Sequence, residues 1–328
     1  RLRRRRGLRG LLTLLIIAVA GLLPTQARAE LSVNTQTFHP AIGAENIITV
    51  EGSRTGQRFR PILTGLIDYG HRPLRLIDNA SGQTLAETVR HITTLHMIGG
   101  VALTRWFQLG LDLPIVLYQD FDRATPAADV PNTPASYGLG DVRVVGKVRL
   151  LNNSKSGIGL AFVPQLTFPS GDGKQLRGDD AYGIEPRFAL DYRSQGGAII
   201  ALNLGFLGRT SDQVLRNLRI SSQVRYGLGM YVPLPEGFGL MGEFAGGTSV
   251  ATEPNGPIYS PLEGHVGGRW AHRSGFQLNL GTGMGFTDAP GSPKFRFFAS
   301  VGYAPMEREK VSEPPKPTTA PILVEKSG

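Results

Sequence analysis

Charged side chains alternate with apolar ones along several stretches of this chain. The stretch 182–192 shows the pattern most clearly, because Glu185, Arg187 and Asp191 stand between apolar residues. A period of two places the two sets on opposite faces of a β-strand. If such strands close into a barrel, the charged face lines an interior where it can attract ions and solutes. The residues predicted to face this interior are Asp112, Arg143, Lys147, Arg149, Glu185, Arg187, Asp191, Arg219, Arg225, Glu243, Glu263, Arg269 and Arg296.

Two interpretations of these interior charges are open. If cations and anions gather on separate walls, they leave a wet channel whose field selects small ions or solutes. If they interlock, they form a buried network of ion pairs and the barrel is structural. Barrels of about eight strands are filled by side chains, whereas those of about sixteen are open. A barrel of intermediate size favours a narrow or plugged interior.

Other residues that could do chemistry have simpler explanations. His272 and Ser274 have the spacing of a catalytic base and nucleophile, but a polar turn explains them fully. The six histidines show no pairing at i,i+2 or i,i+4 suited to a metal ion. The stretch 170–180 lacks the closing glutamate of a calcium loop, and the glycines from Gly281 onward do not match a nucleotide motif. We expect no catalytic residue, no metal and no cofactor.

Twelve stretches have the alternation of strands. They are 62–69, 88–103, 106–117, 139–151, 157–168, 182–192, 198–206, 218–232, 238–248, 262–270, 276–286 and 295–303. Eleven residues tilted by about 40° rise about 28 Å, enough to cross an apolar band of about 25 Å. The sequence therefore predicts an all-β fold, a transmembrane antiparallel up-and-down β-barrel of about 12 strands over residues 61–303.

The links between these strands alternate in length. Short links lie at 104–105, 152–156, 193–197, 233–237 and 272–275, and long ones at 70–87, 118–138, 169–181, 207–217, 249–261 and 287–294. Barrels of the bacterial outer membrane have short periplasmic turns and longer external loops. They also carry a girdle of aromatic residues at each interface. The predicted interface aromatics are Trp106, Tyr118, Tyr182, Tyr192, Trp270 and Tyr303. We expect outer-membrane lipid and lipopolysaccharide to surround the barrel.

Prolines and glycines interrupt the predicted strands. Pro114, Pro164 and Pro186 each remove one ladder hydrogen bond, and we expect β-bulges at these points. Glycine is abundant, with 43 residues, and is spread through the strands rather than gathered in one tract. Glycine within a strand marks a bend, a bulge or a close approach of another backbone.

The first 29 residues are predicted to be a secretory signal peptide. An arginine-rich start precedes the apolar run 11–23, and small residues predict cleavage after Ala29. Seven of the 35 basic residues lie in this peptide, which leaves 28 against 26 acidic residues and gives no reason to expect nucleic acid. The sequence has no cysteine, which excludes a disulfide framework and thiol chemistry.

Two segments flank the predicted barrel. Residues 30–60 are mixed, with one short strand-like run at 46–51, and form either a periplasmic lead-in or a segment inside the lumen. Residues 304–328 are rich in proline and predict an extended periplasmic tail or linker. Such a tail could contact peptidoglycan or a periplasmic protein.

The organisation resembles the N-terminal barrel of OmpA-family and related porin-like outer-membrane proteins. The likeness is carried by Phe38-His-Pro-Ala and 46–52 at the entry, by 111–118, by the loop 168–173 and by 295–303. It covers about residues 37–303 and does not include the peptidoglycan-binding domain that follows such barrels. The resemblance implies an integral protein of the bacterial outer membrane with a structural or porin-like role, and no enzyme.

Two alternatives to this role are kept. The first is a passive channel for uptake of a small solute. The second and more remote one is an outer-membrane lipid hydrolase, because the His272–Ser274 spacing is also seen in the outer-membrane phospholipase, another twelve-stranded barrel.

Overall fold

The computed structural model describes residues 34–43, 45–77, 84–122, 136–153, 157–215, 218–250 and 260–305. The predicted signal peptide, its cleavage site at Ala29 and residues 306–328 of the predicted tail lie outside these ranges. Within the described ranges, no helix is long and apolar enough to cross a membrane.

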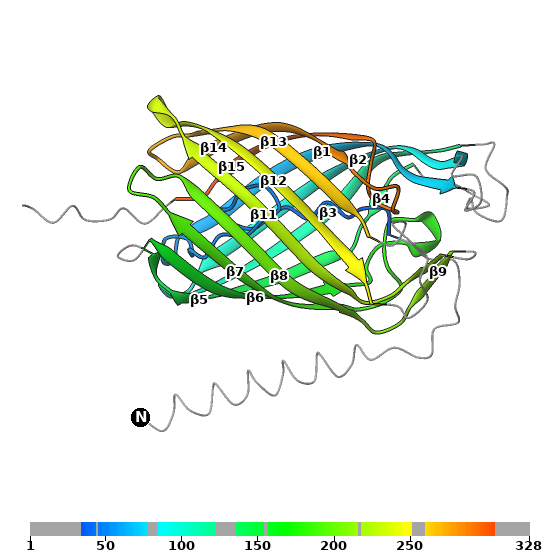
Figure 1. Ribbon diagram of the computed structural model, residues 1–328, viewed down its shortest axis with the longest axis horizontal. Helices are drawn as coiled ribbons and strands as arrows, with labels where there is room; N and C mark the ends of the chain where they lie inside the picture. The colour runs from blue at the N-terminus through cyan, green and yellow to red at the C-terminus, as the bar shows by residue number, and fades with distance from the viewer. Residues whose placement is uncertain are drawn as a thin grey trace, which may run out of the picture.

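Twelve antiparallel strands of the described chain close into a barrel (Figure 1). The wall strands are β1 (Pro61–Ile77), β2 (Thr84–Ala102), β3 (Phe107–Phe121), β5 (Val142–Leu151), β6 (Ile158–Phe168), β7 (Gly183–Arg193), β8 (Ile199–Arg209), β11 (Gln223–Pro233), β12 (Phe238–Ser249), β13 (Leu262–Ala271), β14 (Phe276–Gly285) and β15 (Phe295–Tyr303). Each pairs with the wall strands before and after it, and β1 pairs with β15 from Leu63↔Tyr303 to His71↔Phe295. This confirms the predicted fold class.

Short elements occur in the links between wall strands, most of them at the end that carries the long links. Strand β4 (Gly138–Leu139) pairs with β3, while β9 (Gln213–Leu215) and β10 (Leu218–Ile220) form a separate hairpin. Two 3₁₀ turns, η2 (Gly173–Gln175) and η3 (Pro235–Gly237), lie in a long and a short link respectively. The prediction of one continuous strand over 218–232 is wrong, because the strand is interrupted at residues 221 and 222, between β10 and β11. Arg209 holds this break by donating from Nη1 to the carbonyl of Ser221 at 2.8 Å.

The outer face of the wall is apolar, as the alternation predicts. On β8, Leu202 and Leu204 are 49% and 58% exposed, whereas Ala201 and Asn203 between them are buried. The six predicted interface aromatics lie within three residues of strand ends: Trp106, Tyr192, Trp270 and Tyr303 at the short-link end, and Tyr118 and Tyr182 at the long-link end. Side chains of this kind suit a surface that contacts lipid rather than water.

The prolines are accommodated differently from the prediction. Pro164 of β6 and Pro186 of β7 face one another, and the register passes through the pair without a shift. The outer neighbours β5 and β8 also keep one offset on both sides of them. The expectation of bulges is therefore wrong at these two positions. Pro114 instead lies where β3 passes from β5 to β4, and its carbonyl still accepts the N–H of Gly140 at 2.9 Å.

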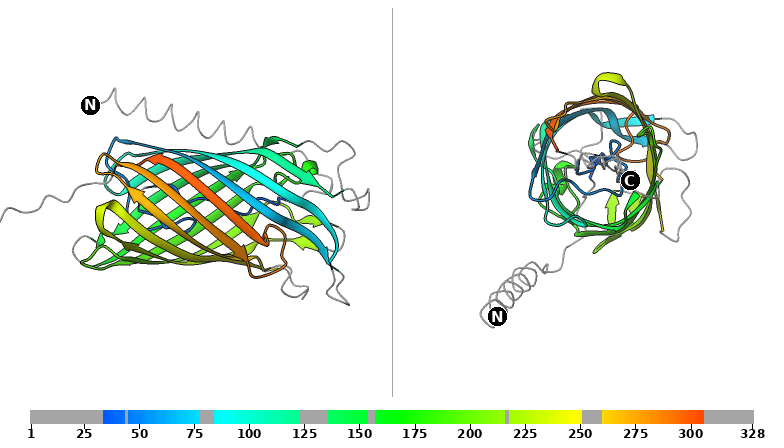
Figure 2. Two further views of the ribbon diagram at one scale, coloured as in Figure 1. Left: turned by 90° about the horizontal axis from the view of Figure 1, so that it is seen from above. Right: turned by 90° about the vertical axis from the view of Figure 1, so that its left-hand side faces the viewer.

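Residues 34–56, here called the lumenal segment, run through the interior of the barrel (Figure 2, right). At the long-link end the side chain of Asn34 donates to Asp141 at 3.3 Å. At the short-link end the hydroxyl of Thr55 donates to the carbonyl of Arg105 at 2.9 Å. The segment therefore passes along the whole length of the barrel, and the wall encloses it.

The lumenal segment contains no strand among its described residues, which corrects the strand expected at 46–51. Its chain turns there, and the N–H of Ile47 donates to the carbonyl of Val50 at 3.0 Å. Two glycines of β11 make room for this turn. A Cβ at Gly229 would lie 2.9 Å from the Ile47 side chain, and one at Gly227 would lie 2.9 Å from that of Val50. These strand glycines mark a close approach, as glycine in a strand often does.

Candidate functional site

The inner wall and the lumenal segment together form the candidate site. The structure brings eleven of the thirteen predicted interior charges there, where they contact one another, bond to the lumenal segment or line a cavity. Arg149 is half-buried near the end of β5. Arg219 belongs to the β9–β10 hairpin rather than to the wall, and its side chain lies outside the described residues.

One group of charges interlocks across β1, β12, β13 and β15. Arg296 pairs with Asp68 and, at 3.1 Å, with Glu263. The imidazole of His265 lies 3.2 Å from carboxylate oxygens of both Glu263 and Glu243. Phe38 of the lumenal segment covers the group, with the Arg296 guanidinium 4.6 Å from its ring centre. Each of these buried carboxylates contacts a guanidinium or an imidazole, which leaves little for a solute to bind.

A second interlocked group joins β2, β3 and β5. Arg143 pairs with Asp112 at 2.9 Å, and Asp112 also accepts from His96 at 3.0 Å. Arg143 further donates to Gln165 and to the carbonyl of Pro40, each at 2.9 Å. Side chains of the wall thus bind the backbone of the lumenal segment as well as its side chains.

Glu243 of β12 holds the turn of the lumenal segment. Its carboxylate accepts the backbone N–H groups of Ile48, Thr49 and Val50 at 3.0, 2.9 and 3.1 Å. Arg269 of β13 donates to the carbonyl of Ile47 at 2.8 Å from the other side. The backbone groups that a strand would have paired are therefore satisfied by two charged side chains.

At the short-link end, Asp191 of β7 fixes the exit of the lumenal segment. It accepts the N–H of Ser53 at 2.7 Å and its hydroxyl at 2.9 Å. The amide of Asn153 donates to the same carboxylate at 2.8 Å, and Arg54 donates to Asn153 at 2.6 Å. Arg193 pairs with Glu45 nearby.

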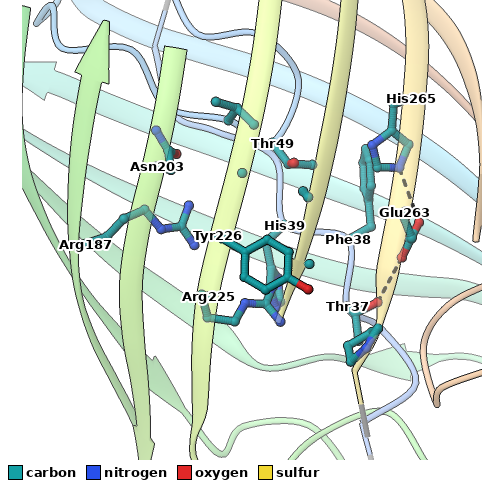
Figure 3. Close-up of a pocket in the computed structure, with 15 residues that line it drawn as sticks. Thr37, Phe38, His39, Thr49, Arg187, Asn203, Arg225, Tyr226, Glu263 and His265 are labelled. Carbon is teal, nitrogen blue, oxygen red and sulfur yellow. Dashed lines mark hydrogen bonds and ion pairs between the residues drawn. The ribbon is translucent and has the colours of Figure 1, made fainter. Parts of the chain in front are cut away.

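The cations on β7, β8 and β11 have fewer partners. Arg187 bonds to one oxygen of Glu185 through Nε at 2.8 Å and Nη2 at 2.6 Å, and Arg209 pairs with Asp179 at 3.1 Å. Among the residues that the structure describes, Arg225 donates only to the amide oxygen of Gln223, at 3.3 Å. Figure 3 shows Arg187 and Arg225 pointing into one pocket beside His39 of the lumenal segment. The charges of the barrel are therefore interlocked on one side and less completely paired on the other.

Two small cavities follow this side of the lumenal segment. The first, of about 40 Å³, is lined by residues that include Arg187, Asn203 and Arg225. The second, of about 60 Å³, has Asn34 and Arg209 in its lining and lies nearer the long links. Both share Arg225 and His39, so the two cavities adjoin.

Asp141 lies outside the wall strands, at the long-link end. Burial raises the pKa of this carboxyl to about 7, and the negative charge of Asp179 adds to the rise. The backbone N–H groups of Asp179 and Gly171 donate to it at 2.6 and 3.0 Å and act in the opposite direction. This acid therefore changes charge near neutral pH.

The remaining candidates for chemistry are local. The Ser274 hydroxyl and the His272 Nδ1 lie 2.8 Å apart in the exposed turn between β13 and β14, and the backbone N–H of Ser274 donates to the same nitrogen at 3.3 Å. This geometry is that of a side chain closing a turn. In the described part of the chain, no group of three or more His, Cys, Asp or Glu side chains is arranged to hold a metal ion.

The predicted interior charges omitted the histidines His96 and His265. Each occupies an inward position of a wall strand, so the alternation itself was a signal for them. Each of the two histidine rings lies beside two carboxylates, and this contact makes it part of the charged interior. His96 lies between Asp68 and Asp112, which come from two different neighbouring strands. Spacing within a single strand does not reveal such a grouping.

Comparison with known proteins shows the fold. No family model and no curated protein sequence matches this chain. An outer-membrane channel from Pseudomonas putida F1 is similar in structure, with a TM-score of 0.57 and 13% identity over 76% of this chain and 97% of that chain.

Two other solved structures are less similar to this chain. The β domain of the Bordetella autotransporter BrkA has a TM-score of 0.41 and 15% identity, over 74% of this chain and 98% of its own. The toluene transporter TodX of Pseudomonas putida has a TM-score of 0.38 and 10% identity, over 85% and 99%. At 13% identity, the similarity to the P. putida channel establishes the architecture: a closed antiparallel barrel of the kind found in bacterial outer membranes.

Proposed function

We propose that the protein is an integral barrel of the bacterial outer membrane with a porin-like role, closed by its own lumenal segment to all but small solutes. The apolar outer face, the aromatic residues at the strand ends and the sorting of short and long links support the location. The similarity to a known outer-membrane channel supports the fold on which this role depends.

The observation that carries the proposal is the space left beside the lumenal segment. The adjoining cavities of about 40 and 60 Å³ have charged and polar side chains in their linings, and each has room for a few water molecules. An open porin of about sixteen strands has a continuous aqueous bore instead. A narrow, water-lined path therefore fits the geometry better than a wide pore.

Planar-bilayer recording tests this proposal. We expect purified, folded protein to give small, reproducible conductance steps, well below those of an open porin. Heat-modifiable gel migration checks that each preparation holds a closed barrel before recording. Silence over many insertions of folded protein would remove the channel.

A structural role is the second candidate, and the interlocked charges around Arg296 favour it. The resemblance to OmpA-family barrels points the same way, and membership of that family stays a prediction. The two roles separate in the bilayer experiment, because a structural barrel conducts nothing.

We further propose that the protein is not an enzyme. The contact of Ser274 with His272 closes a turn, and the pair lies at the short-link end, away from the outer leaflet. Incubation of the purified protein with phospholipid vesicles should release no fatty acid. Hydrolysis that disappears in Ser274→Ala would overturn this part of the proposal.

A further inference from the structure

Arg225 differs from the other arginines inside the barrel. Arg296 meets two carboxylates and Arg143 meets one, whereas the bond from Arg225 to Gln223 is to a neutral amide. No carboxylate of the described residues lies within ion-pair distance of Arg225. A guanidinium carries five N–H donors in a planar fork, so most of those on Arg225 face the cavity without a protein acceptor.

Arg187 adds a second cation to the same cavity. Within the described part of the chain its only carboxylate partner is Glu185, which accepts both bonds on a single oxygen. Only one of the two guanidinium groups is thus paired with a carboxylate, and the cavity keeps an excess of one positive charge. Glu263, an acid that lines the cavity, is already bound by Arg296 and His265.

The cavity also has the right position and size for a small ligand. It adjoins the second cavity, which extends toward the long links and has Arg209 in its lining. His39, which belongs to the lumenal segment, borders both cavities (Figure 3). Each cavity has room for a few water molecules, and Arg187, Arg209 and Arg225 contribute to their linings.

We propose that Arg225 and Arg187 bind a small oxoanion, a carboxylate or inorganic phosphate, in this cavity. The planar fork of a guanidinium matches the two oxygens of such an anion, and each charge-assisted bond is stronger than a neutral one. If the barrel conducts as proposed above, this site also makes the path prefer anions to cations. The preference for anions rests on the proposed function, whereas the binding of the oxoanion does not.

Binding of inorganic phosphate tests the site directly. The probe is the ³¹P linewidth of phosphate titrated with folded protein in a detergent that lacks phosphate. We expect saturable broadening by the unaltered protein and at least a tenfold weaker affinity for Arg225→Gln. Arg273→Gln, the same change in an exposed turn, is the matched control and should bind as the unaltered protein does. Equal binding by Arg225→Gln and the unaltered protein would overturn the site, as would broadening that does not saturate.

Arg225→Lys keeps the test decisive if Arg225→Gln fails to fold. It retains the charge and loses the fork, so we expect binding weaker than in the unaltered protein. Unchanged affinity in this variant would contradict the recognition proposed for the guanidinium.

Reversal potentials in a potassium chloride gradient separate the site from the channel. We expect anion preference in the unaltered protein, reduced in Arg225→Gln and reversed in Arg225→Glu. Phosphate binding without any conductance would retain the site and reject the channel. Conductance with an ion preference that Arg225→Gln leaves unchanged would retain the channel and reject the site as its selectivity element.

Discussion

Lys147 of β5 and Glu51 of the lumenal segment form an ion pair of 2.6 Å between Nζ and Oε2, and both side chains are almost fully buried. Lys147 also donates to Asn46 at 2.9 Å. The wall is therefore tied to the segment it encloses by a charge pair that water does not reach. Such a pair is costly to break, because removing one partner leaves the other charged and buried.

Lys147→Met should destabilise the folded barrel by about 3–5 kcal/mol, the usual cost of leaving a buried charge without its partner. Urea unfolding in detergent, followed by the fluorescence of Trp106 and Trp270, measures the change. The double variant with Glu51→Met should recover much of the loss, because no charge is then left alone. A double variant as unstable as Lys147→Met would contradict this account of the pair.

Gly229→Leu should displace the lumenal segment and widen the path. A Cβ alone would lie 2.9 Å from the Ile47 side chain, and the remaining leucine atoms have no room. We expect a several-fold larger conductance per insertion and faster proteolysis within 34–56. Gly65→Leu is the matched control, since a Cβ there meets nothing within 4 Å. Identical behaviour of the two variants would mean that the segment does not limit the path.

Asp141 should make the long-link end more stable in mild acid. Its pKa is raised from 3.8 to about 7 by burial and by Asp179, so the folded protein holds this proton more tightly than the unfolded chain. The stabilising contribution is complete below about pH 4 and is lost as the pH rises through about 7. Amide hydrogen exchange over 170–180 should give higher protection factors at about pH 5 than at about pH 8. Asp141→Asn should abolish the difference, and greater protection at the higher pH would show that another group dominates.

Cysteine labelling on whole cells should show which end of the barrel is outside. The chain has no cysteine of its own, so each introduced thiol reports one position. Ser136→Cys and Ser260→Cys lie in long links and should react with a membrane-impermeant maleimide, whereas Ser194→Cys in a short link should not. Labelling of Ser194→Cys alone would reverse the proposed orientation.

The wall was predictable because the alternation of polar and apolar residues within each strand is enough to assign them to the inner or the outer face. In β7 the residues Glu185 and Arg187 alternate with Ile184 and Phe188, and no partner strand is needed to assign them to opposite faces. Twelve repetitions of this local pattern, with sorted link lengths, specify a barrel. The predicted strand bounds are wrong where the apolar periodicity continues but the strand does not. At Ser221 the strand is interrupted and the carbonyl accepts a hydrogen bond from Arg209, which the periodicity does not show.

The interior arrangement was less predictable, because its contacts join distant parts of the chain. The run from Ile47 to Val50 is rich in β-branched residues and has the propensity of a strand. Three of its N–H groups instead bond to Glu243, 193 to 195 positions away, which overrides that propensity. In the same way, Arg187 and Arg225 look alike in the sequence, and only the fold shows that Glu185 pairs with one and not the other.

The enclosed segment also constrains assembly. It precedes every wall strand in the chain, yet Thr37 bonds to the carbonyl of Gly291, 254 positions later. The seam between β1 and β15 joins the two edges of the sheet around it. If the barrel closed before the lumenal segment had entered it, Lys147, Asp191 and Glu243 would be left without their partners on that segment. We therefore expect the wall and the lumenal segment to insert into the bilayer together.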